Sequence, residues 1–265
     1  MVGSSNMQFR TIHLPPFMIH HYSALGSTND RLKELSDAPE FTCIVADEQR
    51  AGRGRNGRAW HSTPGAGLYL SILLCPKGAS SRTPLLSLAA GICVAEVLAQ
   101  DSIGGIDLKW PNDVLVHERK ISGILIEGVS SGTQIHRLVM GIGVNLNAGS
   151  FPPELSQTAT SLAIETGRHI AVDEFRNRLL KRIAEWYARW TAGEDQAILD
   201  RWQELSSYAT GKQVLVTLGE APLTGETAGL TETGALRVRT GDDQLKIVYA
   251  GEIMSLRTPG AAHGR

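Results

Sequence analysis

The sequence is poor in cysteine and has no stretch with the composition of a membrane span. Its three cysteines, Cys43, Cys75 and Cys93, are an odd number, and each lies in an apolar stretch. This pattern favours buried, reduced thiols over a disulfide framework or a cysteine-ligated metal. No hydrophobic run approaches the ~20 residues that a membrane helix needs, and Met1–Asn6 lacks the basic start and apolar run of a signal peptide. We therefore expect a cytoplasmic protein without a membrane partner.

The chain also lacks an excess of charge of either sign. It contains 26 lysines and arginines against 27 aspartates and glutamates, a formal net charge of −1. A protein that coats nucleic acid normally carries a broad basic excess, so no nucleic-acid partner is expected. Any anion-binding site must therefore be a local feature. With 42% hydrophobic residues in 265, the chain can bury a sizeable core.

The organisation of the sequence predicts a mixed α/β body followed by a small β module. We expect an N-terminal extension over residues 1–20, a catalytic domain over 21–208, a C-terminal β domain over 209–258 and a tail over 259–265. The boundary near Ser207–Gly211 follows from a change in composition. Beyond it, valine, leucine and threonine alternate with frequent glycines, which is typical of the short strands of a small barrel.

Residue patterns predict the main elements of the body. Ser27-Thr28-Asn29 before an amphipathic run is typical of a helix N-cap, and Thr83-Pro84 predicts that threonine caps a buried helix. Apolar residues at three- and four-residue spacing predict a further helix. The expected helices cover Thr83 to about Ala99, Asp173 to Trp190, and Asp195–Leu205. The expected strands are Phe41–Ala46, Leu68–Cys75, Ile106–Trp110, Val114–Val116, Ile121–Glu127 and Leu138–Asn145.

The glycine- and arginine-rich segment Gly52–Arg58 is the most unusual stretch. It matches G-x-G-x-x-G, but the residues that follow cannot form the helix that a dinucleotide-binding turn requires. Neither a kinase signature nor a phosphate-binding G-x-x-x-x-G-K-[ST] motif accompanies it. Glycines let backbone amides approach an anion, and arginines bind phosphate or carboxylate through two hydrogen bonds. The segment therefore predicts a loop over an anionic ligand, with a solvated basic loop as the alternative.

Three further segments carry polar residues at strand ends. Lys109–Asp113 has the composition of a β-turn. Lys120–Glu127 places a lysine at the entrance of an apolar strand, followed by small residues that let a ligand lie against the backbone. Gly141–Asn147 is a strand whose glycines leave space on one face and whose Asn145 would be buried and in need of partners. Each segment alone is weak evidence for a site, because a β-turn, a strand-end lysine and a buried structural asparagine are ordinary features of folded proteins.

In this order and spacing, the segments resemble the biotin protein ligase family. The resemblance spans nearly the whole chain from about residue 20, and the arginine-glycine loop is highly specific to that family. It is carried by Ser27-Thr28-Asn29, Gln49, Gly52–Arg58 with Trp60, Lys109–Asp113, Lys120–Glu127, Gly141–Asn145 and the closing Gly251–Arg257.

The resemblance implies an α+β fold and an activity. The fold is a mixed β-sheet with flanking helices, similar to the class II tRNA synthetase core, followed by an SH3-like β-barrel. The activity is ATP-dependent: the biotin carboxylate attacks the α-phosphate of ATP, giving biotinyl-5′-AMP and pyrophosphate, with Mg²⁺ as the metal cofactor. A lysine of a biotin carboxyl carrier domain, from acetyl-CoA carboxylase or another carboxylase, then displaces AMP.

The same resemblance assigns roles to individual residues. Lys120 is the expected catalytic cation beside the biotin carboxylate and the α-phosphate, Arg55 the expected contact to the adenylate, and Asp113 the expected Mg²⁺ ligand. The expected biotin-binding residues are Ser27, Thr28, Asn29, Gln49, Gly52, Arg53, Gly54, Arg55, Lys120 and Gly123. The expected nucleotide-binding residues are Arg53, Arg55, Arg58, Trp60, Asn112, Asp113, Asn145 and Arg257.

Two positions depart from the family pattern. Arg50 stands where glutamine or threonine is more common, and Ser122 where glycine or alanine is usual; because serine is small, the pocket should be kept. Many relatives carry an N-terminal helix-turn-helix domain and act as repressors. Since only about twenty residues precede the body here, we expect a ligase without repressor activity. Family members form dimers by pairing catalytic sheets edge to edge, so the resemblance allows a homodimer here, but the sequence leaves open the oligomeric state and its dependence on ligand.

Other functions remain open at this point. A lipoate ligase or a lipoyl/octanoyl transferase shares the fold, although the arginine-glycine loop and Lys109–Asp113 argue against it. A non-catalytic biotin- or nucleotide-binding regulator would bind its ligand without turnover, but it leaves the combination of Lys120 with the loop arginines unexplained. Nucleic-acid binding through the arginine loop is opposed by the lack of an extended basic face.

Overall fold

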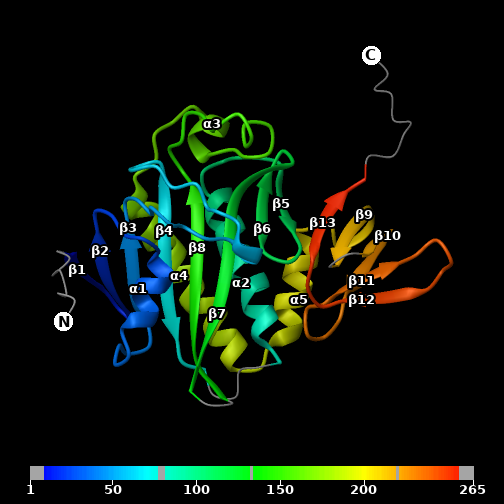
Figure 1. Ribbon diagram of the computed structural model, residues 1–265, viewed down its shortest axis with the longest axis horizontal. Helices are drawn as coiled ribbons and strands as arrows, with labels where there is room; N and C mark the ends of the chain where they lie inside the picture. Colours follow the sequence, from blue (N-terminus) through cyan, green and yellow to red (C-terminus); the bar gives the residue numbers. More distant parts are fainter. Residues whose placement is uncertain (1–8, 77–80, 132–133, 219–220, 257–265) are drawn as a thin grey trace.

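The computed structural model describes residues 9–76, 81–131, 134–218 and 221–256, which form two sheets with helices against the larger one (Figure 1). The larger part contains β1 (Phe9–Leu14), β2 (Phe17–Tyr22), α1 (Thr28–Glu34), β3 (Thr42–Ala46), the 3-10 turn η1 (Arg55–Gly57), β4 (Gly67–Leu74), α2 (Thr83–Ala99), β5 (Ile106–Lys109), β6 (Asp113–Val116), β7 (Arg119–Ser131), β8 (Gln134–Asn145), α3 (Leu162–Thr166), α4 (Val172–Thr191) and α5 (Asp195–Glu204). The smaller part contains β9 (Thr210–Leu218), β10 (Ala221–Leu230), β11 (Leu236–Arg239), β12 (Leu245–Val248) and β13 (Glu252–Ser255).

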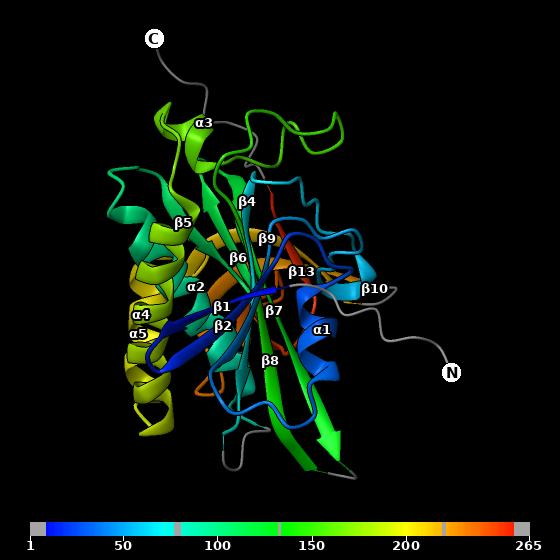
Figure 2. The same cartoon turned by 90° about the vertical axis from the view of Figure 1, so that its left-hand side faces the viewer.

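The larger sheet has eight strands in the order β1-β2-β3-β4-β8-β7-β6-β5. Strands β2 and β3 are parallel, and the other neighbours are antiparallel, so the sheet is mixed as expected. Helices α2, α4 and α5 cover one face of this sheet, and α1 lies on the other (Figure 2). The predicted strands correspond to β3 through β8, and the α+β fold class is confirmed.

Helix α2 is buried along nearly its whole length because it lies between the sheet and α4 and α5. It begins at Thr83 with Arg82 in the cap position, so the predicted threonine cap is wrong. The side chain of Arg82 pairs with Asp195 and donates from Nη2 to the Trp190 carbonyl over 2.5 Å. These contacts hold Arg82, the residue before Thr83, in the cap position. No helix within the described ranges is long and apolar enough to cross a membrane.

The N-terminal segment requires a correction. Residues 1–20 were expected to be an extension, yet β1 and β2 pair as a hairpin at the edge of the main sheet, with the Phe9 strand outermost. The physical reason is local. Apolar residues alternate on either side of Pro15-Pro16, so that β2 buries Phe17 and Ile19 in the main core on one face and Tyr22 with Leu25 and Leu32 on the other. The main sheet therefore starts at Phe9.

The smaller sheet has five antiparallel strands in the order β12-β11-β10-β9-β13. It is joined to the larger part beside the segment Lys109–Asp113. Trp110 donates from Nε1 to the Gly234 carbonyl over 3.0 Å, and Ser206 donates from Oγ to the Leu108 carbonyl over 2.5 Å. These contacts hold the smaller sheet against the larger part of the chain, and Gly251 and Glu252 at the start of β13 line the cavity described below.

Candidate active site

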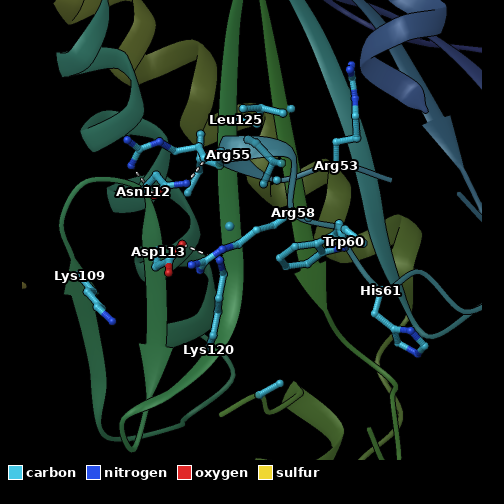
Figure 3. A pocket seen from close by; sticks show the side chains of 18 of the residues that line it. Arg53, Arg55, Arg58, Trp60, His61, Lys109, Asn112, Asp113, Lys120 and Leu125 are labelled. Atoms are coloured by element: carbon cyan, nitrogen blue, oxygen red, sulfur yellow. Dashed lines mark hydrogen bonds and ion pairs between the residues drawn. The ribbon is translucent and has the colours of Figure 1, made fainter. Parts of the chain in front are cut away.

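A cavity of about 510 Å³ lies between the main sheet, the arginine-glycine loop and the start of β13. Figure 3 shows some of the side chains that line it. It gathers residues that are far apart in the sequence and come from both parts of the chain. The sequence-predicted site residues that line it are Ser27, Thr28, Asn29, Gln49, Arg53, Gly54, Arg55, Arg58, Trp60, Asn112, Asp113, Lys120, Gly123 and Asn145. Gly52 is not among the lining residues, and Arg257 lies outside the described residues.

The arginine-glycine loop is a closed turn whose shape is fixed by backbone contacts. Arg53 and Ala59 form an antiparallel bridge, and Gly54 N–H donates to the Arg58 carbonyl over 2.7 Å. The tip bends through left-handed backbone at Asn56 and Gly57, with φ of 55° and 73°. Asparagine and glycine are the residues that adopt this conformation most readily. The side chains of Arg53, Arg55 and Arg58 point from this turn toward different partners.

Arg53 points toward carboxylates at one end of the cavity. Its guanidinium pairs with Asp30 of α1 and lies 3.6 Å from Oε1 of Glu127 on β7. Lys33 joins the same cluster, 2.7 Å from Glu127 and 3.3 Å from Asp30. Although burial opposes its ionisation, hydrogen bonds from Lys33 and Asn29 lower the pKa of Glu127. The cluster accounts for the charge of Arg53 without a ligand, which the sequence did not predict.

Arg55 and Arg58 reach the smaller part of the chain. Arg55 donates from Nη1 to Asn112 Oδ1 over 3.3 Å and to the Gly251 carbonyl over 3.4 Å, and Arg58 pairs with Glu252. Burial lowers the pKa of Arg55, because a low-dielectric site disfavours the charged form. An anion bound in the cavity would stabilise the charged form of Arg55. The loop thus presents Arg55 without a carboxylate partner among the described residues.

Lys120 and Asp113 form an ion pair in the cavity, with 2.6 Å between Nζ and Oδ1 (Figure 3). The Trp60 ring lies beside them, its centroid 5.5 Å from Lys120 Nζ. The ring rests on a glycine surface, since a Cβ at Gly143 would come within 2.5 Å of Trp60 Cε2 and one at Gly123 within 3.0 Å of Trp60 Cζ3. The Trp60 Nε1 is buried without a hydrogen-bond partner among the described residues.

The end of the cavity away from Lys120 combines neutral polar groups with apolar walls (Figure 3). The backbone N–H and Oγ1 of Thr28 both donate to Gln49 Oε1, over 2.8 and 2.9 Å. Ser27 is the N-cap of α1, as predicted. Leu70, Ile142 and Leu125 line the same space. This end therefore suits a neutral group that makes hydrogen bonds and carries an apolar body.

Three predicted residues make close contacts with other protein groups, and two of them, Asn29 and Asn145, also line the cavity. The Asn29 amide is engaged with protein groups: Oδ1 lies 2.5 Å from Ser71 Oγ, and Nδ2 donates to Glu127 over 2.7 Å. Gly52 lies behind the wall, where a Cβ would come within 2.9 Å of the Trp60 carbonyl. Asn145 is buried and donates to the Thr160 carbonyl over 3.0 Å.

Sequence reasoning missed several lining residues. Lys109 and Glu252 lie inside motifs that carried the resemblance, but no role was assigned to them. Phe151 and Leu155 come from a loop that the sequence analysis left without a prediction. The run Phe151-Pro152-Pro153, an aromatic residue followed by two prolines, was the available signal for a rigid apolar loop.

The cavity has the size and the lining to suit a small ligand with a neutral polar end and an anionic end. Sequence comparison then supplies the family. The Biotin/lipoate A/B protein ligase family matches residues 23–145, and the Biotin protein ligase C terminal domain matches residues 210–254. The chain belongs to the biotin protein ligase family.

Individual relatives agree with this placement. The chain is 32% identical over 242 residues to the bifunctional ligase/repressor BirA of Bacillus subtilis, covering 89% of this chain and 73% of that protein. It is 31% identical over 234 residues to the biotin–[acetyl-CoA-carboxylase] ligase of Paracoccus denitrificans, covering 86% and 96% of the two chains. The biotin protein ligase of Aquifex aeolicus in complex with biotin and ATP superimposes with a TM-score of 0.80 at 35% identity, over 91% and 99%.

Proposed function

We propose that this chain is an ATP-dependent biotin protein ligase, which forms biotinyl-5′-AMP and then transfers biotin to a lysine of a carrier domain. One observation carries the proposal. The cavity joins a slot with neutral polar groups, at Thr28 and Gln49, to a cationic region around Lys120, with the indole of Trp60 beside it. Biotin, with its ureido ring and carboxylate, and a nucleotide, with its base and phosphates, need these three environments side by side.

The first half-reaction brings two anions together. In our proposal the ureido ring occupies the slot at Thr28 and Gln49, and the biotin carboxylate and the α-phosphate meet at Lys120. A fixed ammonium there offsets the repulsion between them and stabilises charge that develops on the phosphorus oxygens. Trp60 offers a flat face for the adenine ring. Arg55 would contact the adenylate, and its loop would keep water from the mixed anhydride.

The second half-reaction requires access for a carrier lysine. We propose that its acceptor is the biotin carboxyl carrier domain of acetyl-CoA carboxylase or another biotin-dependent carboxylase, in keeping with the name of the Paracoccus denitrificans relative. The amine attacks the acyl carbon of the adenylate, and AMP leaves. A homodimer is a further proposal, which analytical ultracentrifugation with and without biotin and ATP would test.

Magnesium fits this site as a companion of the nucleotide. Within the described ranges, no three His, Cys, Asp or Glu side chains gather in a metal-binding cluster. Mg²⁺ is commonly held by one or two carboxylates together with substrate phosphates. Asp113 would hold it here, because its carboxylate faces the cavity beside Lys120. When bound, Mg²⁺ would neutralise phosphate charge during the first half-reaction.

The test is biotin-dependent exchange of labelled pyrophosphate into ATP, run with and without Mg²⁺. We expect exchange with biotin and Mg²⁺, and none with lipoate in place of biotin. Exchange with lipoate instead would identify a lipoate ligase. Binding of biotin in a calorimeter without any exchange would identify a non-catalytic regulator.

A further inference from the structure

The cations of the cavity are not all paired. Lys120 is paired with Asp113, and Arg58 with Glu252. Lys109, which also lines the cavity, has no carboxylate oxygen of the described residues within 4.0 Å of its ammonium group. A cation that faces a cavity without a carboxylate partner is available to an anionic ligand.

The backbone fixes where Lys109 lies. Strands β5 and β6 pair as an antiparallel hairpin in which Lys109 is directly opposite Asp113. Cross-strand partners project on the same face of a sheet, so both side chains face the cavity. The carboxylate of Asp113 is nevertheless taken by Lys120 from the neighbouring strand β7. Figure 3 shows Lys109 on the opposite side of Asp113 from Arg53 and Leu125.

The surroundings of Lys109 make its charge costly without a ligand. Burial lowers the pKa of Lys109, and the neighbouring charge of Lys120 lowers it further, although Asp113 opposes this. The ring of Tyr208, whose centroid lies 6.0 Å from Lys109 Nζ, is the nearest aromatic contact. Such a contact compensates only weakly at that distance. A polyanion bound in the cavity would stabilise the charged form.

We propose that Lys109 binds the β- and γ-phosphates of ATP and stabilises pyrophosphate as it leaves; this rests on the proposed function. A carboxylate oxygen of biotin forms a bond to the α-phosphorus. The bond from that phosphorus to the oxygen that bridges to the β-phosphorus breaks, and its electron pair leaves with pyrophosphate. Because the attacking and leaving oxygens are roughly in line, pyrophosphate departs on the side away from biotin. Lys109 lies beyond Asp113 on that side.

The variant Lys109→Gln tests the proposal in both half-reactions. In pyrophosphate exchange, we expect its KM for pyrophosphate to rise at least about tenfold, the effect of losing one charge-assisted contact. Transfer from synthetic biotinyl-5′-AMP to a purified biotin carboxyl carrier domain needs no pyrophosphate and should stay within about twofold of the wild type. Lys109→Arg should restore most of the pyrophosphate affinity.

The matched control is Lys212→Gln. Lys212 also lies over the Tyr208 ring, 4.8 Å from its centroid, but it does not line the cavity. It should exchange pyrophosphate like the wild type, and thermal unfolding should show that every variant is folded. An unchanged KM for pyrophosphate in Lys109→Gln, with an active wild type, overturns the role of Lys109. Equal losses in both half-reactions would overturn it too, because they indicate a structural effect. Absence of exchange in the wild type overturns the proposed function itself.

Discussion

Replacing Lys120 with alanine should nearly abolish formation of biotinyl-5′-AMP. The ammonium is the cation expected at the reacting α-phosphate, and removal of one such preorganised donor typically costs about 10²–10³ in kcat. The loss also leaves the Asp113 carboxylate, now 2.6 Å from Lys120 Nζ, without that partner. At about 5 Å from a phosphate oxygen and an effective dielectric constant of about 20, its repulsion adds about 3 kcal/mol.

The two contributions set the expected range. Each 1.36 kcal/mol corresponds to about a factor of ten, so an unscreened Asp113 would add about another 10² to the loss. Bound Mg²⁺ would screen that repulsion. The rate of adenylate formation should therefore fall by between about 10² and 10⁵, and it should fall most at low Mg²⁺.

Single-turnover formation of biotinyl-5′-AMP, followed by rapid quench, measures this loss directly. The Lys120 side chain is 35% exposed, so the free energy of unfolding should change by less than about 1 kcal/mol. Lys246→Ala, on the surface of the smaller sheet, is the matched control and should react like the wild type. A rate for Lys120→Ala within about tenfold of the wild type, from a folded protein, would refute the assignment.

Three further predictions concern the ring, the loop and the core. Gly143→Ala should raise the KM for ATP and leave biotin affinity unchanged, because the new Cβ would come within 2.5 Å of Trp60 and displace its ring; steady-state exchange and biotin calorimetry measure the two. Arg55→Gly should release biotinyl-5′-AMP and label lysines of an unrelated protein such as albumin, because the guanidinium expected on the adenylate is gone. Glu96→Gln should lower the free energy of unfolding at neutral pH by about 2 kcal/mol, since Arg182, Trp186 and Arg201 all donate to this carboxylate; urea denaturation measures it.

The pH dependence of the last variant follows from the sign of the pKa shift. Burial disfavours the charged form of Glu96, but hydrogen bonds from Arg182, Trp186 and Arg201 prevail and lower its pKa from the ordinary 4.5. A carboxyl with a lowered folded-state pKa stabilises the fold above its unfolded pKa and loses that contribution as pH falls through the folded value. The difference between wild type and Glu96→Gln should therefore shrink below pH 4.5. A difference that persists undiminished in acid would mean that packing, not charge, causes it.

Matched controls separate specific from general effects in the other two. Gly149→Ala places a Cβ in open space and should leave the KM for ATP unchanged. Arg50→Gly removes an exposed arginine next to the same loop and should not cause labelling of albumin. If Gly143→Ala binds ATP normally, Trp60 does not face the adenine. If Arg55→Gly stays selective for the carrier domain, Arg55 does not retain the adenylate.

Much of the fold could be predicted from sequence because its signals are local. Helix α4 shows this well: Phe175, Leu179, Ile183 and Trp186 recur at helical spacing and are all buried. The hairpin β1-β2 was missed although its alternation is equally local, because six-residue strands beside a double proline are easily taken for an irregular start. The spacing of apolar residues thus predicted long elements better than short ones.

The candidate site was also predictable only in part. Motif order alone predicted which segments meet in the cavity, since the resemblance supplied the topology. It could not predict the partners of individual side chains. Arg53 was expected on the ligand, but its partners Asp30 and Glu127 come from α1 and β7, which are far apart in the sequence. No role was predicted for Lys109, because its lack of a carboxylate partner becomes evident only when the position of Asp113 is known.

The balance of charge in the cavity is consistent with the proposed binding of two anions by a chain with a net charge of −1. Carboxylates neutralise some of the cations: Asp30 and Glu127 hold Arg53, and Glu252 holds Arg58. Within the described part of the chain, Arg55 and Lys109 have no carboxylate within 4.0 Å. The positive charge left for a ligand is therefore confined to a few positions around Lys120. In the proposed reaction, such confinement would bind phosphates at the reacting atoms without the broad basic surface that attracts nucleic acid.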